Sequence, residues 1–339
     1  MTLTTRFTEA YGIRHPIACA AMAFVASDPG LAIAVAKAGG LGAIGAGAMP
    51  PEAIGMVVGA FRANAAGPIH INLVVFLTND AMIDACVAVR PDIVSFHWGH
   101  PTRAWIERLQ GAGIKVWEQI GSVAAAVAAI TDGVDLVIVQ GSEAGGHNCG
   151  ELPIFTAIPA VRKAVGVTPL LLAAGGIGDG ATMAAALALR ADGVVVGSRF
   201  VASVEGDAHA DYKQAIVESD GSDTCLTSMF GRDMPHFNPM RVIANRVVRE
   251  WQGREDEMPA EDNRLPQIGT THVGGQDIPL ARFSGFVPTR GATGDLQEMA
   301  FLAGQGIGQI TSIETVATII ETMVTDAEAV IAALAKQSA

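Results

Sequence analysis

Short apolar runs alternate with Ala-rich helical stretches along the first two-thirds of the chain, and this alternation constrains the fold more than any other feature. The helical stretches carry end signals, such as Asp28 as N-cap, Pro29 at the first helical position and Gly39 after the end. Continuous apolar runs are typical of parallel strands buried on both faces. Eight such βα units predict an α/β fold, a closed (β/α)8 TIM barrel, rather than an open sheet. The runs lie at 16–20, 41–44, 69–76, 93–96, 115–119, 135–139, 170–173 and 193–196.

The alternation breaks after about residue 210. Residues 211–295, here called the inserted segment, are richer in charge, Pro and Met, and 242–251 has a helical pattern. We expect a smaller, mainly helical domain or lid on the substrate side. Residues 296–339 return to Ala-rich helix, interrupted by glycines at 304–308, and are predicted to pack back against the barrel formed by residues 1–210.

Composition excludes several classes of protein. Of 339 residues, 50% are hydrophobic and 17% charged, which favours a large buried core over disorder. The net charge of −12 argues against nucleic acid and anionic membrane surfaces, where Lys and Arg must dominate. The chain start lacks a signal-peptide pattern, and a polar interruption breaks the apolar stretch at 16–49. Four widely spaced cysteines indicate neither a disulfide framework nor zinc, and predict a reducing cytoplasm: Cys19, Cys86, Cys149 and Cys225.

Glycines follow the seventh and eighth predicted strands, in the loops at 174–177 and at Gly197-Ser198. Phosphate often binds in these two loops of a (β/α)8 barrel. Glycines let backbone N–H groups approach a phosphate, and a following helix start favours the negative charge. The alternative is that these glycines only form tight βα turns.

The run from Gln140 to His147 (QGSEAGGH) leaves the sixth strand toward the same end of the barrel. Gln140 offers a donor and an acceptor to the edge of a heterocycle. Gly145 and Gly146 remove side chains, so that a flat ring can approach the backbone. His147 can serve as acid, base or donor near neutral pH. The alternative is a loop histidine that is satisfied by backbone groups.

Two further motifs have a chemical and a plain interpretation. His97 and His100 lack a third ligand at suitable spacing, so we predict no metal and expect pocket contacts or helix-start packing. Cys149 near His147 could form a nucleophile pair, but a spectator thiol is favoured because sequence neighbours need not face each other.

Several of these motifs together resemble the nitronate monooxygenase family and the related FMN-dependent enoyl-acyl-carrier-protein reductases. The resemblance covers nearly the whole chain. The segment 95–101 (SFHWGHP) is similar to an FHFGxP-like element of the monooxygenases, whereas the reductases have smaller residues there, so the former is favoured. The motifs are LAIAVAKAGGLGAIG at 31–45, GSEAGGH at 141–147, AAGGI at 173–177 and GSRF at 197–200.

The resemblance implies an FMN across the barrel mouth. Ala21 and Met22 would lie along the ring, Asn72 and Gln140 would meet its polar edge, and His147 matches the active-site histidine. The ring and phosphate would be held by backbone groups of Gly145, Gly176, Val196, Gly197 and Ser198.

The chain departs from the family pattern at three places. Asn148 and Cys149 both precede Gly150, where the family usually has one residue after the histidine. Val195 replaces a common Gln, and Ser198 replaces the usual Thr.

The predicted activity is oxidation of alkyl nitronates with O2 to a carbonyl compound and nitrite. His147 would donate to the nitro group, pair with its charge, or remove a proton from a nitroalkane. The alternative is an NAD(P)H-dependent FMN reductase of quinones or enoyl thioesters, and a third option is a non-enzymatic flavin-binding or phosphate-binding scaffold. The expected partners are a nitronate or another small electrophile, O2 or NAD(P)H, and a second copy of the chain in a homodimer.

Overall fold

Eight parallel strands form the main sheet of the computed structural model, which describes residues 3–47, 49–259 and 265–337. In sheet order they are β1, β9, β8, β6, β5, β4, β3 and β2. The backbone of Leu41, just before β2, bonds to Ile17 and Cys19 of β1 at 2.9 Å each, which closes the barrel and confirms the predicted (β/α)8 fold. The strands are β1 (Ile17–Cys19), β2 (Gly42–Gly45), β3 (Ile69–Val74), β4 (Ile93–His97), β5 (Lys115–Ile120), β6 (Leu136–Gln140), β8 (Leu170–Ala174) and β9 (Gly193–Val196).

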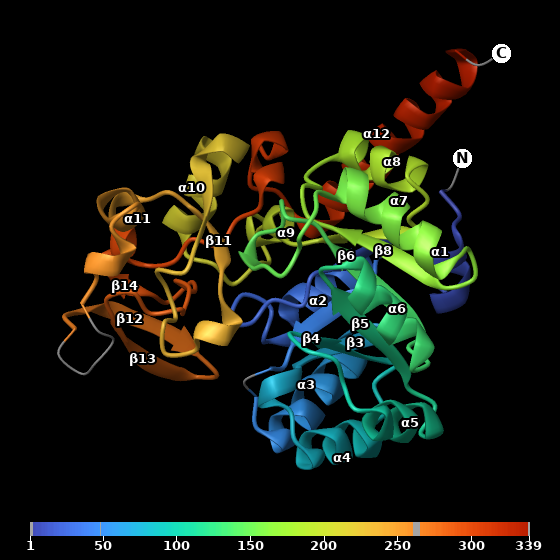
Figure 1. The fold of residues 1–339 in the computed structure, drawn as a ribbon, viewed down its shortest axis with the longest axis horizontal. Helices are drawn as coiled ribbons and strands as arrows, with labels where there is room; N and C mark the ends of the chain where they lie inside the picture. Colours follow the sequence, from blue (N-terminus) through green and yellow to red (C-terminus); the bar gives the residue numbers. More distant parts are fainter. Residues whose placement is uncertain (1–2, 48, 260–264, 338–339) are drawn as a thin grey trace.

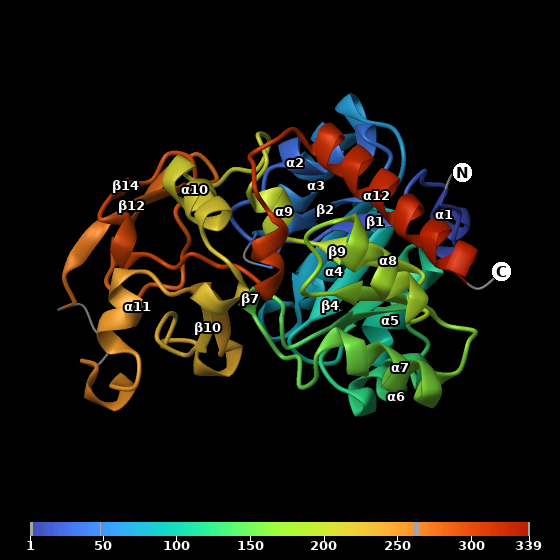
Figure 2. The same cartoon turned by 90° about the horizontal axis from the view of Figure 1, so that it is seen from above.

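A ring of helices covers the outside of this barrel (Figures 1 and 2). The end signals act as predicted in the first of them, where the Asp28 side chain accepts from the N–H of Gly30 at 2.6 Å. The ring is completed by α12 (Val316–Gln337), which packs on α8 and α2. The other helices are α2 (Pro29–Lys37), α3 (Pro51–Asn64), α4 (Asp80–Val89), α5 (Arg103–Gly111), α6 (Val123–Thr131), α7 (Ile154–Val165) and α8 (Gly180–Ala188).

The core has an inner and an outer layer because successive side chains of a strand point to opposite faces. On β5, Trp117 points into the barrel, whereas Val116 packs under the helices. The short helix α1 (Arg6–Tyr11) contributes Phe7 and Tyr11 to the inner layer, where both contact Trp117. Within the described residues, no helix is both long and apolar enough to cross a membrane.

The chain leaves the barrel after β9 and the short α9 (Ser198–Val201), and rejoins it at α12. The inserted segment therefore lies between the last strand and the last helix, and forms the yellow and orange part beside the barrel in Figure 1. The proposed domain limits after residues 210 and 295 stay a prediction.

The expectation of a mainly helical inserted segment needs correction, because two small three-stranded sheets run through it. One sheet joins β10 (Thr224–Thr227), β11 (Met240–Ile243) and β7 (Gly146–His147); the other joins β13 (Gln276–Ala281), β12 (Gln267–Val273) and β14 (Thr293–Gly294). The helix expected at 242–251 is only α11 (Arg246–Trp251), because the residues before its N-cap pair as β11. A second helix, α10 (Ala210–Glu218), precedes the sheets.

Candidate active site

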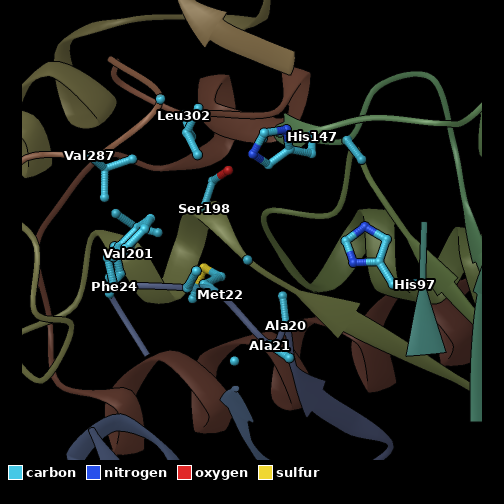
Figure 3. A pocket seen from close by; sticks show the side chains of 18 of the residues that line it. Ala20, Ala21, Met22, Phe24, His97, His147, Ser198, Val201, Val287 and Leu302 are labelled. Atoms are coloured by element: carbon cyan, nitrogen blue, oxygen red, sulfur yellow. The ribbon is translucent and has the colours of Figure 1, made fainter. Parts of the chain in front are cut away.

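A cavity of about 490 Å³ lies at the carboxyl ends of the barrel strands, between the barrel and the inserted segment. Residues that follow β1, β3, β6, β8 and β9 form one wall, which is where active sites of such barrels lie. The other wall is formed by the inserted segment and by part of residues 296–339, here called the returning chain. Figure 3 shows His147 and His97 near one end, and Phe24 and Val287 at the other. The cavity therefore has an end with two imidazoles and an apolar end.

His147 reaches the cavity from β7, which pairs with β11 of the inserted segment. Its Nδ1–H donates to the backbone carbonyl of Phe237 at 2.5 Å, since a carbonyl oxygen can only accept. The Phe237 ring also stacks on the imidazole, with ring centroids 3.5 Å apart. In the neutral ring the proton is therefore on Nδ1, and Nε2 carries the free lone pair.

Burial lowers the pKa of His147 to about 4, although the hydrogen bond to Phe237 opposes this shift. At neutral pH the imidazole is uncharged, so it cannot pair with the charge of an anion. Its Nε2 can instead accept a proton. The arrangement is that of a general base held in one tautomer by the inserted segment.

Gln140 lines the cavity at the end of β6, but both ends of its amide bond to the adjacent loop. Its Nε2 donates to the carbonyl of His147 at 3.0 Å, and its Oε1 accepts from the N–H of Cys149 at 2.9 Å. The amide that was expected at the edge of a heterocycle thus also positions the backbone of His147.

Asn148, one of the two residues between His147 and Gly150, clamps this loop. Its buried side chain donates through Nδ2 to the carbonyl of Ala144 at 2.8 Å and accepts through Oδ1 from the N–H of Gly150 at 2.7 Å. The next residue, Cys149, lines a separate hollow outside the cavity. Burial raises the pKa of the Cys149 thiol to about 11, so the spectator interpretation is favoured over a nucleophile pair.

Gly145 is required by packing of a kind that the sequence pattern did not indicate. A Cβ at this position would lie 2.4 Å from the backbone nitrogen of Gly304 and 2.5 Å from the carbonyl carbon of Ala303. In the same run, both carboxylate oxygens of Glu143 accept from the N–H of Ile154, at 3.0 and 3.1 Å, and so cap α7. Part of this run therefore joins the barrel to the returning chain.

The two loops expected to bind phosphate meet at the cavity. Gly175 and Gly176 follow β8 with φ angles of 108° and 69°, and Gly197 and Ser198 follow β9. No side-chain hydrogen bond caps the start of α9 at Gly197, so its first N–H groups are free of a side-chain cap. An anionic group would find backbone donors at this place.

Val196 is the one predicted cofactor contact that does not line the cavity. Its side chain packs in the layer between sheet and helices, and Val195 faces the cavity instead, because neighbouring strand residues point to opposite faces. The other predicted contacts all line the cavity: Ala21, Met22, Asn72, Gln140, Gly145, Gly176, Gly197 and Ser198.

The two histidines of the segment 95–101 lie in different places. His97 lines the cavity, its Nε2 is buried without a hydrogen-bond partner, and burial lowers its pKa to about 3. His100 instead bonds to Glu118 at 2.9 Å and to Asp132 at 2.8 Å outside the cavity. In the part of the chain that the structure describes, no group of three or more His, Cys, Asp or Glu is placed to hold a metal ion.

Sequence reasoning missed the aromatic residues of the cavity. Phe237 supplies both the carbonyl and the ring that hold His147, and Trp98, which lines the separate hollow, packs edge-on against Phe237 with centroids 5.2 Å apart. At the apolar end, Phe24 contacts Phe286 at 4.7 Å between centroids. No local signal marks these residues, because their roles come from contacts between distant segments.

The chain matches the family model described as nitronate monooxygenase over residues 4–85 and 78–326. Two curated relatives are each named a probable nitronate monooxygenase. The protein of Staphylococcus saprophyticus is 29% identical over 305 residues, covering 76% of this chain and 84% of the relative. The protein of Staphylococcus aureus is 29% identical over 297 residues, covering 75% and 82%.

Solved structures share the fold over almost the whole chain. FabK from Thermotoga maritima is 33% identical with a TM-score of 0.81, covering 99% of this chain and 100% of that chain. Nitroalkane oxidase from Streptomyces ansochromogenes is 24% identical with a TM-score of 0.77, covering 97% and 99%. At the lower identity the likeness concerns the fold alone.

Proposed function

Because the chain belongs to the nitronate monooxygenase family, and is thus a flavin-dependent oxidoreductase, we propose that it binds FMN and oxidises alkyl nitronates with O2. The products are a carbonyl compound and nitrite. The single observation that carries the proposal is His147, a half-buried neutral imidazole whose Nε2 lone pair is free at the cavity.

The residues present fit FMN. The volume of about 490 Å³ lies within the range of about 300–1,000 Å³ typical of small-molecule and cofactor sites. A flat ring would lie along Ala21 and Met22 on the barrel wall, and Asn72 would meet its polar edge. The loops at Gly176 and Gly197 offer backbone N–H groups to the phosphate.

Bound flavin supplies the redox chemistry, and the side chains orient the substrate and move its proton. We propose that His147 Nε2 takes the proton from the carbon beside the nitro group, which converts a neutral nitroalkane to the nitronate. The Phe237 carbonyl stabilises the resulting imidazolium through Nδ1–H. His97 lines the same cavity, but its Nε2 is buried behind the cavity surface.

A second candidate is an NAD(P)H-dependent reductase of quinones or enoyl thioesters. The apolar end of the cavity favours it, because Phe24, Phe286 and Val287 would suit an acyl chain or a quinone ring. The two candidates differ in what reduces the flavin.

The absorbance of the flavin under anaerobic conditions distinguishes them. Purified protein is mixed separately with an alkyl nitronate, NADH and NADPH. The proposal predicts bleaching by the nitronate and none by the nicotinamides. Rapid bleaching by NADH or NADPH alone would assign the protein to the reductases, and a protein with no affinity for FMN would favour a function without flavin.

A further inference from the structure

A line of buried polar side chains runs from the cavity down the barrel interior. Asn72 and His70 are two residues apart on β3 and share its inner face, and Ser95 of β4 is the register partner of Asn72. Asn72 Nδ2 donates to Ser95 Oγ at 2.8 Å, and Ser95 Oγ lies 2.6 Å from His70 Nε2. The three residues are 7%, 0% and 2% exposed for Asn72, Ser95 and His70, so water cannot replace these bonds.

The donors and acceptors in this line follow one direction. Burial lowers the pKa of His70 to about 3, so its ring is neutral. Ser95 Oγ accepts from Asn72, and among the described residues His70 Nε2 is the acceptor within hydrogen-bond distance of the buried Ser95 hydroxyl. The hydroxyl therefore donates its proton to Nε2, and the imidazole proton is on Nδ1.

The surroundings of His70 support this tautomer. Its Nδ1 has no hydrogen-bond partner among the described residues, and the Trp117 ring lies 4.9 Å from the imidazole between centroids. An aromatic face attracts an N–H and repels a lone pair. Trp117 is itself fixed, because its Nε1–H donates to the Tyr11 hydroxyl at 2.6 Å.

We infer that Ser95 and His70 are positioning residues that fix the Asn72 amide with its Oδ1 toward the cavity, where it accepts from a ring N–H of bound flavin. Asn72 lines the cavity, and no described residue donates to its Oδ1. The polar edge of the oxidised flavin ring carries one N–H between two carbonyl groups, so an acceptor recognises it. This inference rests on the proposed FMN site and adds the residues that set the polarity of its wall.

The opposite arrangement is chemically distinct. If His70 Nε2 carried the proton, it would donate to Ser95, and the Ser95 hydroxyl would turn to the oxygen of a flipped Asn72 amide. The amide would then present N–H groups to the cavity and repel the ring N–H. The tautomer of His70 therefore reports the direction of the whole line.

The test combines FMN binding with NMR of the imidazole nitrogens. Ser95→Ala removes the link and lets the amide rotate, whereas Ser203→Ala removes another fully buried hydroxyl that lies outside the cavity. For Ser95→Ala we expect about tenfold weaker FMN binding, the equivalent of one hydrogen bond of about 1.4 kcal/mol, and a shifted flavin absorbance. Ser203→Ala should keep the wild-type affinity and spectrum. In wild-type protein, His70 should show Nδ1 protonated and Nε2 unprotonated from pH 5 to 9.

The outcomes separate this inference from the proposed function. If Ser95→Ala keeps the wild-type affinity and spectrum, or if Nε2 of His70 carries a proton, the positioning role of Ser95 and His70 is overturned. The proposed flavin site is not affected by either result. A wild-type protein that binds no FMN would instead overturn the proposed function, and with it the positioning role of Ser95 and His70. If Ser95→Ala fails to fold, the His70 tautomer in the wild-type protein decides alone.

Discussion

The two walls of the cavity present different chemistry. The barrel wall offers small side chains and backbone, as at Ala21 and Gly176, with Asn72 held from below by buried hydrogen bonds. The inserted wall offers large rings such as Phe237 and Phe286, and it holds His147 through a backbone carbonyl. A flat cofactor with a phosphate suits the first wall, and a small organic substrate suits the second.

This difference shows how one site can be assembled from two kinds of structure. Each barrel strand pairs with a neighbour on both sides. The loops that follow neighbouring strands therefore lie close together at the carboxyl end of the barrel. The inserted segment has its own core around Met240, Phe283 and Val248. It meets the barrel through the pairing of β11 with β7 and through a buried cluster that Tyr212 of α10 shares with Val201. We propose that the barrel wall fixes the flavin and the inserted wall selects what meets it.

The largest loss of stability is expected where the walls touch. Gly145→Ala places a Cβ against the backbone of Ala303 and Gly304, which cannot move like a flexible side chain. We expect a loss of about 3 kcal/mol in the free energy of unfolding, measured by urea denaturation. Gly59→Ala, at an exposed helix position with open space, is the matched control and should gain about 0.5 kcal/mol. Equal stabilities of the two variants would contradict the close approach.

Phe237→Ala removes the ring that covers His147 while the backbone carbonyl remains. We expect kcat/KM to fall about tenfold with the flavin content unchanged, because the imidazole loses its stacked neighbour. Phe155→Ala, at a ring 70% exposed on α7, should leave both unchanged. Loss of bound flavin in Phe237→Ala would mean that the inserted wall holds the cofactor. It would contradict the proposal that the barrel wall alone fixes the flavin.

The pH dependence tests how deeply the inserted wall buries His147. A base must be unprotonated, and burial lowers the pKa of His147 to about 4. For a neutral nitroalkane, kcat/KM should therefore be constant above about pH 5 and fall about tenfold per pH unit below about pH 4. In Phe237→Ala this acid limb should move up, because water then favours the charged ring. An acid limb near the ordinary value of about 6.5 in the wild type would contradict the burial.

Smaller losses of stability than that of Gly145→Ala are expected at helix caps in the two regions. Asn79 caps α4 of the barrel through one partly buried bond from the N–H of Met82 at 3.1 Å. Asn245 caps α11 of the inserted segment, and its buried side chain also donates to the carbonyl of Met299 at 2.8 Å. We expect Asn79→Ala to lower the free energy of unfolding by about 1 kcal/mol and Asn245→Ala by about 2 kcal/mol. Equal losses in thermal unfolding would show that the second bond of Asn245 adds nothing.

The barrel could be predicted from sequence because each βα unit carries its own signals. Asp28 before Pro29 is a local signal for the start of a helix. A short apolar run after each helix is a local signal for a strand that is buried on both faces. The inserted segment lacks such repetition. Residues 240–243 form a strand only because distant residues, including His147, pair with them, so a helix was the natural expectation there.

The site could be predicted only on its barrel wall. Ala21 follows β1, Asn72 lies near the carboxyl end of β3, and His147 lies in the segment after β6. The ends of these strands must meet, so the convergence of the three residues on one cavity is a consequence of the fold. Val196 does not line the cavity, because alternation along β9 sends the Val195 side chain there instead, and a cofactor contact by the Val196 backbone stays a prediction. The contact of Phe237 with His147 uses a backbone carbonyl, and no residue type encodes that group.

The most direct test of the account compares His147→Ala with the wild type on two substrates, a neutral nitroalkane and its preformed nitronate. His272→Ala, on the far strand β12 with 46% of its side chain exposed, is the control and should match the wild type. If His147 Nε2 is the base, kcat/KM for the nitroalkane should fall about 10³-fold, while kcat/KM for the nitronate falls less than about tenfold and FMN stays bound. Equal losses on both substrates, or no loss on either, would contradict the account.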